Sequence, residues 1–301
     1  MVKSFEQLEV LKIYGCKEMQ VVILIEELVE KEKTSQTMFP KLDRLELCYL
    51  PQLVRFCSNC NSFGEVYEAQ GLSGSGSQVV AAAQSKLVET EVTRLVFPRV
   101  TFLALSRLSN FKGFFPKIHI TKWPLLKRML LEQCAKVKTF ASEFPSIQIT
   151  FGDNQLERQT QDPMFWIGKD SFSCLEELKF QQNDNMKEIW REIVKCLEDN
   201  VKDGIVFSQL KSLQLRGLPK LSSFCTRRCN FEFPSLKEAI VIRCPQMKYF
   251  SMGKTITKEL QNVQWSVDKE KQNVQWTNDE EKRHWAGDLD STIQYLFTQK
   301  I

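Results

Sequence analysis

The stretch Phe39–Cys57 reads FPKLDRLELCYLPQLVRFC, and the stretch Phe207–Cys225 reads FSQLKSLQLRGLPKLSSFC. Nine of the 19 aligned positions are identical, and all nine are Phe, Leu, Pro or Cys. The stretches begin 168 residues apart, and almost every polar residue differs between them. A shared apolar skeleton at such a separation indicates an internal repeat.

The repeat has a fixed register, counted here from the aromatic residue that opens each unit. Leu stands at +3, apolar residues at +6 and +8, Leu, Cys or Asn at +11, and further apolar residues at +14 and +17. Seven units fit this register and begin near Phe5, Phe39, Phe97, Trp123, Phe172, Phe207 and Phe233. The pattern L-x-x-L-x-L-x-x-N/C-x-L is that of the leucine-rich repeat.

The physical logic of the repeat predicts the fold. The residues at +6 and +8 point inward from a short strand, while their neighbours point outward. Cys or Asn at +11 satisfies backbone groups in the buried turn that follows. One unit cannot cover its own apolar face, so units must stack. We expect an α/β leucine-rich-repeat solenoid: a curved array with a parallel β-sheet on its concave face and irregular loops and short helices on its convex face.

The chain is expected to have two parts. Residues 1–256 form the repeat array, with loop insertions at 58–93, which contains GLSGSGS, and at 151–163. Apolar residues between Met186 and Val201 recur at helical spacing and predict a convex-side helix. After Phe250 the repeat pattern stops, so residues 257–301 are expected to cap the array.

The proposed cap contains a predicted amphipathic helix. Its apolar residues follow helical spacing: Leu289, Ile293, Leu296 and Phe297. Asp290 or Ser291 is a candidate for capping the helix at its start. We expect the apolar face to dock on the seventh unit, around Ala239, Val241 and Met247. The first unit, at Phe5, has no comparable device and is expected to be frayed or sticky.

Composition excludes several classes of protein. The net charge of +4 is small because 41 basic residues are nearly balanced by 37 acidic ones, which argues against a nucleic-acid-binding protein. The apolar run Val21–Ile25 is far too short to span a membrane. The chain carries no signal-peptide pattern and no Asn-x-Ser/Thr sequence. A cytoplasmic location is therefore expected, with nuclear or peripheral membrane association left open.

Several long segments resemble one protein family. They are Phe39–Cys57, FFPKIHITKWPLLKRMLLEQCAKVKTF (Phe114–Phe140), FPSLKEAIVIRCPQMKYFSMG (Phe233–Gly253) and the tail WAGDLDSTIQYLF (Trp285–Phe297). They resemble the C-terminal repeats of plant coiled-coil nucleotide-binding leucine-rich-repeat disease-resistance proteins. The resemblance implies that the chain recognises a pathogen effector, or a host protein altered by one. It also implies a restraining contact with an intramolecular nucleotide-binding domain.

One departure from the family is clear. The nearest candidate for a phosphate loop, Gly253-Lys254-Thr255, has Lys248 where a P-loop requires glycine. The chain is therefore expected to be a fragment or truncated product of a receptor, with no cofactor. The alternative function is a leucine-rich-repeat adaptor, such as the substrate-binding half of a ubiquitin ligase. A P-loop domain upstream would favour the receptor, and an F-box-like helical segment would favour the adaptor.

The sequence contains few residues that could form a catalytic site or a metal site. The pairs Cys57/Cys60 and Cys225/Cys229 have ligand-like spacing, but Cys57 and Cys225 hold the same repeat position four units apart. Reduced thiols without zinc are expected. The two histidines, His119 and His284, cannot furnish a histidine cluster. We therefore expect a protein that is not an enzyme.

The concave face is the predicted site of partner binding. Its candidate residues flank the inward pair of each strand: Lys12, Tyr14, Arg44, Glu46, Phe102, Arg128, Leu130, Glu132, Glu177, Lys179, Gln214, Arg216, Glu238 and Ile240. Mixed charge with scattered aromatic and aliphatic residues suits a protein partner better than a nucleic acid. Few residues of such a face are expected to carry binding energy.

Overall fold

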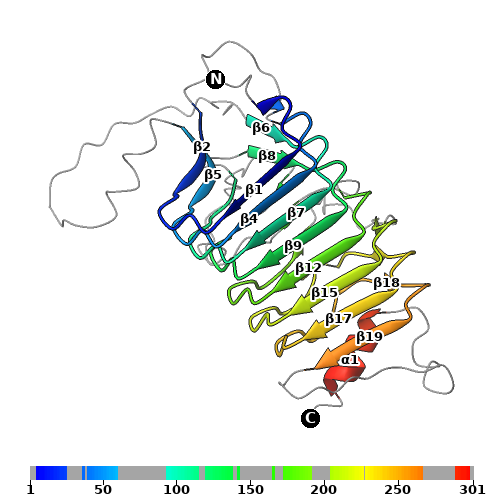
Figure 1. The fold of residues 1–301 in the computed structure, drawn as a ribbon. Coiled ribbons are helices and arrows are strands. Elements are labelled where there is room, and N and C mark those ends of the chain that lie inside the picture. Colours follow the sequence, from blue (N-terminus) through cyan, green and yellow to red (C-terminus); the bar gives the residue numbers. More distant parts are fainter. Residues whose placement is uncertain are drawn as a thin grey trace, which may run out of the picture.

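The computed structural model describes residues 5–25, 36–37, 39–59, 93–114, 119–137, 141–142, 165–166, 172–191, 204–226, 228–266 and 289–298. An eight-stranded parallel sheet runs through these residues (Figure 1). Its strands, in spatial order, are β1 (Val10–Tyr14), β4 (Arg44–Cys48), β7 (Phe102–Ser106), β9 (Arg128–Glu132), β12 (Glu177–Gln181), β15 (Ser212–Arg216), β17 (Glu238–Ile242) and β19 (Asn262–Ser266). The described part of the chain contains one helix, α1 (Leu289–Thr298). The fold is thus α/β with mostly parallel sheet, an arrangement compatible with a solenoid.

The predicted register of the inward residues is confirmed. The +6 residues of successive units pair side by side: Leu11, Leu45, Leu103, Met129, Leu178, Leu213 and Ala239. The +8 residues form a second row: Ile13, Leu47, Leu105, Leu131, Phe180, Leu215 and Val241. From the second unit onward both rows are buried, because alternate residues of a strand point to the same face of the sheet.

The aromatic residues that open the units stack on one another behind the sheet. Phe97 lies between Phe39 and Trp123, with ring centroids 6.3 and 4.1 Å away and interplanar angles of 8° and 5°. Phe207 and Phe233 stack in the same way at 5.1 Å. Offset stacks of this kind contribute about 0.5–1.5 kcal/mol beyond the area they bury. The repeated aromatic letter therefore stabilises each unit against its neighbours.

Shorter parallel sheets complete the units away from the main sheet. They consist of β2 (Val21–Ile25) with β5 (Arg55–Asn59); β3 (Gln36–Thr37), β6 (Thr93–Val96) and β8 (His119–Lys122); β10 (Ala141–Ser142), β11 (Phe165–Trp166) and β13 (Trp190–Arg191); and β14 (Ile205–Val206), β16 (Phe231–Glu232) and β18 (Thr255–Ile256). The backbone groups of each unit's return path thereby find partners in the adjacent units.

The turns after β9 and β12 use the Cys and Asn residues at +11 as predicted. Asn183 is 2% exposed, and its Nδ2 donates to the carbonyl oxygens of Leu131 and Gln181 at 3.0 and 2.9 Å. Its Oδ1 accepts a bond from the Cys134 N–H at 2.8 Å. The thiol of Cys134 itself lies 3.2 Å from the Glu132 carbonyl oxygen. Small polar side chains at this position satisfy backbone groups that would otherwise be buried without partners.

Glycine at position 253 is required by close packing. A Cβ atom there would lie 2.2 Å from the carbonyl oxygen of Cys229. The Gly253 N–H donates to Ser251 Oγ at 3.1 Å, and the Lys254 N–H donates to Asn230 Oδ1 at 2.9 Å. Thr255 belongs to β18 and is fully buried. The sequence Gly-Lys-Thr thus forms a packed turn whose amides are already bonded.

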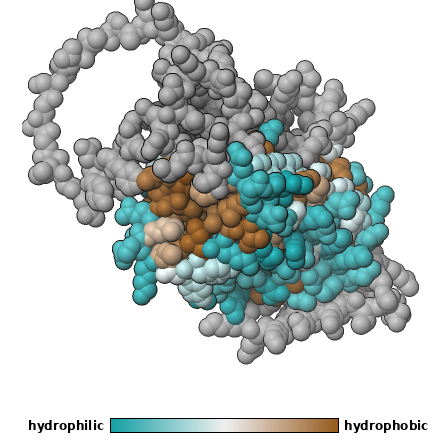
Figure 2. Space-filling model, turned by 45° about the horizontal axis from the view of Figure 1, so that its top comes forward, coloured by the Kyte–Doolittle hydropathy of each residue, from teal (hydrophilic) through white to brown (hydrophobic). Residues whose placement is uncertain are grey.

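The N-terminal end of the main sheet is its least covered part. Phe5 is 38% exposed and Leu24 is 55% exposed. The inward residues of β1, Leu11 and Ile13, are only partly buried, unlike their counterparts in the following strands. Figure 2, in which this end comes forward, shows hydrophobic residues gathered in a patch among hydrophilic ones. The inward residues of the first unit are thus less buried than those of the units that follow.

The C-terminal end differs from the sequence-based expectation. The repeat pattern does not stop after Phe250, because β19 pairs with β17 and aligns Val263 with Ala239. The predicted boundary at residue 256 therefore cuts off one strand of the sheet. The repeat pattern of the unit that contains β19 is hard to recognise in the sequence, because Thr257 stands where the other units have an aromatic residue.

The predicted helix exists and docks on the seventh unit, but on a different part of that unit than expected. It spans Leu289–Thr298, and Leu289 and Ile293 are buried. The helix packs beside β18, and Figure 1 places it at the C-terminal end of the array. The expected docking surface at Ala239 and Val241 lies next to β19 instead. The helix therefore closes the return path of the seventh unit.

One side chain attaches this helix to the array. Asp290 Oδ1 accepts bonds from the N–H groups of Phe250 and Ser251 at 2.7 and 3.2 Å. We expect Asp290→Ala to lower the free energy of unfolding by about 1–3 kcal/mol, since bonds to a charged acceptor are lost. Gln294→Ala, which removes only an exposed contact to Asp290 Oδ2, should cost about 0.5 kcal/mol or less. Urea denaturation measures both, and equal losses would contradict the assignment.

Two other expectations concern the insertions. Residues 60–92 and 151–163 lie outside the described part of the chain, as do residues 192–203 of the predicted convex-side helix. Within the described part, Trp190 and Arg191 form β13 and are not helical. Trp190 is 1% exposed and contacts Phe207 edge-on at 5.1 Å. The apolar periodicity at this point therefore reflects core packing.

Candidate functional site

The side chains facing away from the core on the main sheet form a surface that we call the open face. It comprises positions +5, +7 and +9 of each unit, and it contains all fourteen predicted partner-binding residues. Twelve of the fourteen are exposed or partly exposed. Glu46, at 9% exposure, and Ile240, at 3%, are buried instead. Strand periodicity gives the direction of a side chain, but longer neighbours can still cover it.

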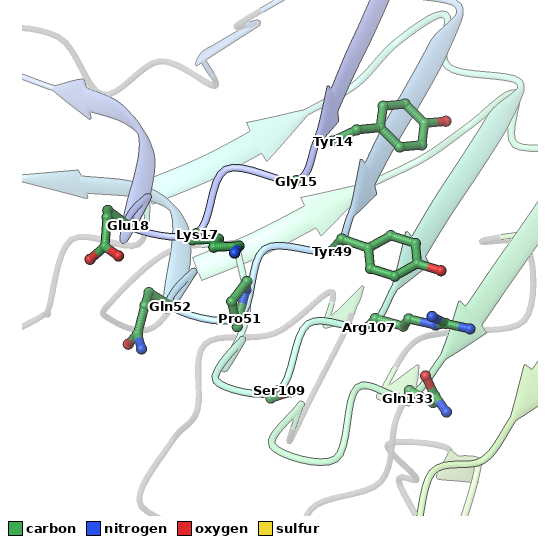
Figure 3. Close-up of a pocket in the computed structure, with 10 residues that line it drawn as sticks. All are labelled: Tyr14, Gly15, Lys17, Glu18, Tyr49, Pro51, Gln52, Arg107, Ser109 and Gln133. Carbon is green, nitrogen blue, oxygen red and sulfur yellow. The ribbon is translucent and has the colours of Figure 1, made fainter.

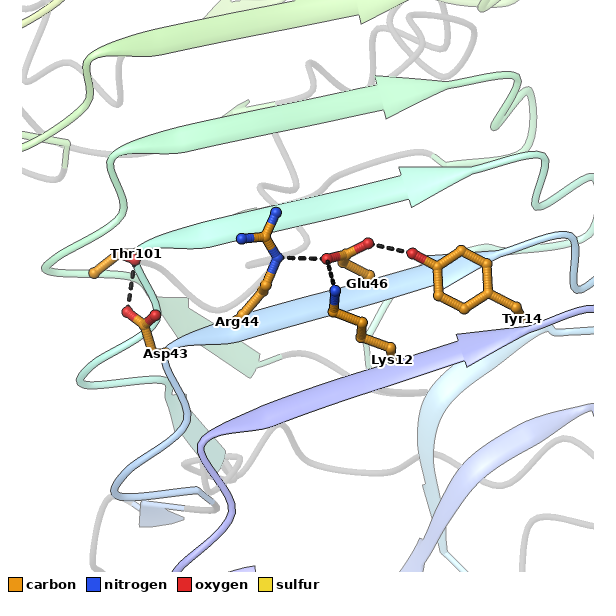
Figure 4. Close-up of polar contacts among 6 residues, drawn as sticks. All are labelled: Lys12, Tyr14, Asp43, Arg44, Glu46 and Thr101. Atoms are coloured by element: carbon orange, nitrogen blue, oxygen red, sulfur yellow. Dashed lines mark hydrogen bonds and ion pairs between the residues drawn. The ribbon is translucent and has the colours of Figure 1, made fainter.

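Glu46 is the centre of a polar cluster on β1 and β4 (Figure 4). Tyr14 Oη donates a hydrogen bond to Glu46 Oε2, and Arg44 Nε donates to Oε1. Lys12 Nζ lies 3.1 Å from the same Oε1. The carboxylate thus meets three donors from two adjacent strands, and its charge is compensated within the protein.

The cluster shifts the pKa values of two groups. Burial on its own raises the pKa of Glu46, but the hydrogen bonds from Tyr14, Arg44 and Lys12 outweigh it and hold the pKa below 4.5. The hydrogen bond to Glu46, reinforced by burial, raises the pKa of Tyr14 from 10.0 to about 12. Both shifts favour the state in which the phenol is protonated and the carboxylate is ionised.

The Tyr14 shift is measurable. The raised pKa of Tyr14 means that the contact contributes stability below about pH 10, which is lost as the pH rises through about 12. The lowered pKa of Glu46 contributes stability above pH 4.5, which is lost as the pH falls through the folded-state value. We expect a phenolate absorbance difference between the parent and Tyr14→Phe to titrate near pH 12, read by rapid mixing before unfolding. Glu46→Gln should move the pKa of Tyr14 toward 10, and an unchanged midpoint would refute the contact.

An aromatic residue with two cations lies beside this cluster. The guanidinium carbon of Arg44 is 3.9 Å from the ring centroid of Phe102, and that of Arg128 is 5.2 Å from it. Both distances allow cation–π attraction. β4, β7 and β9 thus bring a partly exposed aromatic ring between two arginines at the start of neighbouring strands.

Sequence reasoning missed a second row of residues at the end of the strands. Position +10 has a positive φ in all seven units: Gly15, Tyr49, Arg107, Gln133, Gln182, Gly217 and Arg243. Five of these are not glycine, although the left-handed conformation disfavours side chains. Their N–H groups continue the ladder, as when Tyr49 N donates to Ser106 O at 3.0 Å. Residues at +10 are therefore held in a fixed orientation along one rim of the sheet.

A shallow hollow of about 880 Å³ opens along this rim (Figure 3). It is lined by Tyr14, Gly15, Lys17, Glu18, Tyr49, Pro51, Gln52, Arg107, Ser109 and Gln133. Figure 3 shows Tyr14, Tyr49, Arg107 and Gln133 projecting in the same direction from successive units. The Arg107 guanidinium lies 4.4 Å from the Tyr49 ring centroid, and Gln133 Nε2 donates to Gln182 Oε1 at 2.7 Å.

The C-terminal half of the open face is polar and bonded within itself. Lys179 Nζ lies 3.0 Å from Glu177 Oε2 on the same strand. Ser212 Oγ donates to Glu238 Oε2 at 3.0 Å, and Asn262 Nδ2 donates to Glu238 Oε1 at 3.4 Å. The predicted residues Gln214 and Arg216 are partly exposed in this half, and Leu130 on β9 is partly exposed beside it. The aromatic and cationic character of the face is therefore concentrated on β1, β4, β7 and β9.

The cysteine thiols differ sharply in their surroundings. Burial raises the pKa of both Cys134 and Cys244 to about 12, whereas Cys16 is exposed. Since the thiolate is the reactive form, brief alkylation at neutral pH should label Cys16 and spare Cys134 and Cys244 until urea is added. Mass spectrometry of peptides reads the pattern, and labelling of Cys244 in the folded protein would contradict its burial.

Among the described residues, His, Cys, Asp and Glu side chains form no group of three able to hold a metal ion.

Comparisons of the chain with known protein families, with curated protein sequences and with solved structures gave no match. The described part of the chain contains no helix that is long and apolar enough to cross a membrane. The geometry of the open face is therefore the main structural basis for assigning a function.

Proposed function

We propose that the chain is a leucine-rich-repeat solenoid that recognises a protein partner on the open face, which is its concave side. The observation that carries the proposal is the in-register pair of apolar rows beneath a parallel sheet. One side of the strands from β4 to β17 is buried in the core, which leaves the other side for binding. Tyr and Arg, both enriched among residues that dominate binding energy, lie on that other side.

The biological setting of the proposal is plant immunity. The chain acts within plant cells as the recognition portion of a coiled-coil nucleotide-binding receptor, sensing an effector or an effector-modified host protein. It also contributes to autoinhibition through a nucleotide-binding domain of the complete receptor. This setting is supported by the resemblance of Phe39–Cys57 and Phe233–Gly253 to repeats of that family.

The role is one of binding rather than catalysis. The polar groups of the open face are arranged to bond one another, as at Glu46 and Glu238. Such compensated groups give a surface its shape and specificity and leave exposed aromatic and arginine side chains to contribute the binding energy.

Site-specific photo-crosslinking tests the proposal. A crosslinking residue would replace Lys179 or Gln214 on the open face, and in control variants Val206 or Glu232, which are exposed on the β14–β16–β18 sheet. The variants are expressed in leaf tissue with and without pathogen challenge. We expect discrete protein adducts from the open-face positions only, with a change on challenge. Adducts from the control positions alone, or from no position, would overturn the proposal.

A further inference from the structure

The two halves of the open face differ in which of their charged side chains are paired within the protein. In the N-terminal half, comprising β1, β4, β7, β9 and their turns, Glu46 is buried among three donors. Glu132 accepts a bond from Ser106 Oγ at 2.7 Å. By contrast, Arg107 and Arg128 are exposed, and neither makes an ion pair with another described residue. Lys17 and Glu18, both exposed in the turn after β1, offset one another. Arg107 and Arg128 outnumber the partly exposed Glu132, so the accessible charge of this half is net positive.

Aromatic rings hold the two arginines in place. Arg107 lies over Tyr49 at 4.4 Å and Arg128 lies near Phe102 at 5.2 Å. A guanidinium group that rests on a ring keeps its N–H edges available for hydrogen bonds in the plane, the geometry that carboxylates accept in pairs. Tyr14 and Tyr49, which are 52% and 49% exposed, supply apolar surface at low conformational cost.

The spacing of the arginines defines the length of a ligand. Arg128 begins β9, while Arg107 follows β7 and lies level with Gln133, five residues further along the strand direction. At about 3.3 Å per residue, the two are about 17 Å apart along the strands. An extended peptide of about five or six residues covers this distance.

We propose that the N-terminal half of the open face binds an extended acidic segment of the partner protein. Its carboxylates pair with Arg107 and Arg128, and a side chain of the segment lies in the hollow beside Tyr14 and Tyr49. The proposal rests on the proposed function and narrows it, because it names the half of the face and the chemistry of the partner. The C-terminal half, in which Lys179 is already paired with Glu177, contacts other parts of the partner and not this segment.

The test uses a fluorescein-labelled oligoglutamate peptide of about eight residues, with the matching oligoglutamine peptide as the neutral control. Fluorescence anisotropy on the full chain should show saturable binding of the glutamate peptide that weakens as salt is added. Arg107→Ala and Arg128→Ala should each weaken binding about tenfold or more, since a charge-assisted bond is lost. Lys179→Ala and Arg216→Ala, on the other half, should change it by less than about twofold.

Several outcomes would overturn the inference. They are an equal affinity for the glutamine peptide, equal losses in the control variants, and displacement of the peptide by a single-stranded oligonucleotide at lower concentration. Unchanged melting curves of the arginine variants confirm that a loss of binding is not a loss of folding. Protein adducts through Gln214 without peptide binding would preserve the proposed function and overturn the acidic segment. Peptide binding without any adduct in leaf tissue would overturn the proposed function and leave the affinity of this face for acidic segments standing.

Discussion

Truncation of Leu215 to alanine should lower the free energy of unfolding by about 2–5 kcal/mol, as truncation of a buried leucine does. Leu215 is fully buried and stands in the +8 row between Phe180 and Val241. Neighbouring units have fixed spacing, so the structure cannot collapse into the vacated volume without disturbing two strand pairings. Urea denaturation followed by circular dichroism measures the loss.

The matched control is the adjacent residue on the opposite side of the strand. Gln214 is partly exposed, and its Nε2 makes only long bonds, 3.3 Å to Ser212 Oγ and 3.5 Å to Glu238 Oε2. Gln214→Ala should therefore cost about 0.5 kcal/mol or less. Equal losses in the two variants would refute the alternation of inward and outward residues.

The second large effect is expected at Asn183. Asn183→Ala removes the acceptor of the Cys134 N–H and the donor to the Leu131 and Gln181 carbonyls. The Gln181 carbonyl keeps the bond from the Gln133 N–H at 3.0 Å. The Cys134 N–H and the Leu131 carbonyl each lose a buried partner at a cost of about 1–3 kcal/mol, so a total of about 2–6 kcal/mol is expected. Denaturant melts measure this value as well.

Two variants sharpen the test at this position. Asn183→Cys should lose less than Asn183→Ala, because the thiols of Cys134 and Cys244 already lie 3.2 and 3.6 Å from carbonyl oxygens at the same repeat position. Asn185→Ala removes a bond at 3.2 Å to the Ala135 carbonyl and an exposed bond from Lys220 Nζ at 3.0 Å, and it should cost about 1 kcal/mol or less. If Asn183→Ala and Asn185→Ala proved equal, the structural role of the turn residue would be wrong.

The core of the fold could be predicted from the sequence because buried positions carry apolar residues at a regular spacing. The inward positions of a half-buried strand require apolar side chains at every second residue. The spacing of Leu45 and Leu47 therefore marks the strand and its inward face. The +10 row left no such pattern. Tyr49, Arg107 and Gln133 share a left-handed backbone, but their side chains have no property in common from which φ could be inferred.

Other differences arose from neighbouring units. Glu46 is buried because Lys12, Tyr14 and Arg44 converge on it, and no single-strand pattern contains that information. The strand β19 was missed because Thr257 replaces the opening aromatic residue, although Val263 keeps the +6 position. A candidate surface could be predicted from periodicity, but its accessible charge depends on pairings between strands.

Each strand of the main sheet touches only the strands before and after it, and this limits how cooperative unfolding can be. Stability is then the sum of what each unit contributes and what adjacent units contribute to each other. Amide hydrogen exchange should be graded along the chain, slow around β7 and β15 and faster at β1, whose inward residues are half-covered. A partner seated across β1, β4, β7 and β9 would bridge several units at once and so slow exchange at β1 most of all. The surface proposed to recognise a partner would thereby couple the presence of that partner to the order of the whole N-terminal end.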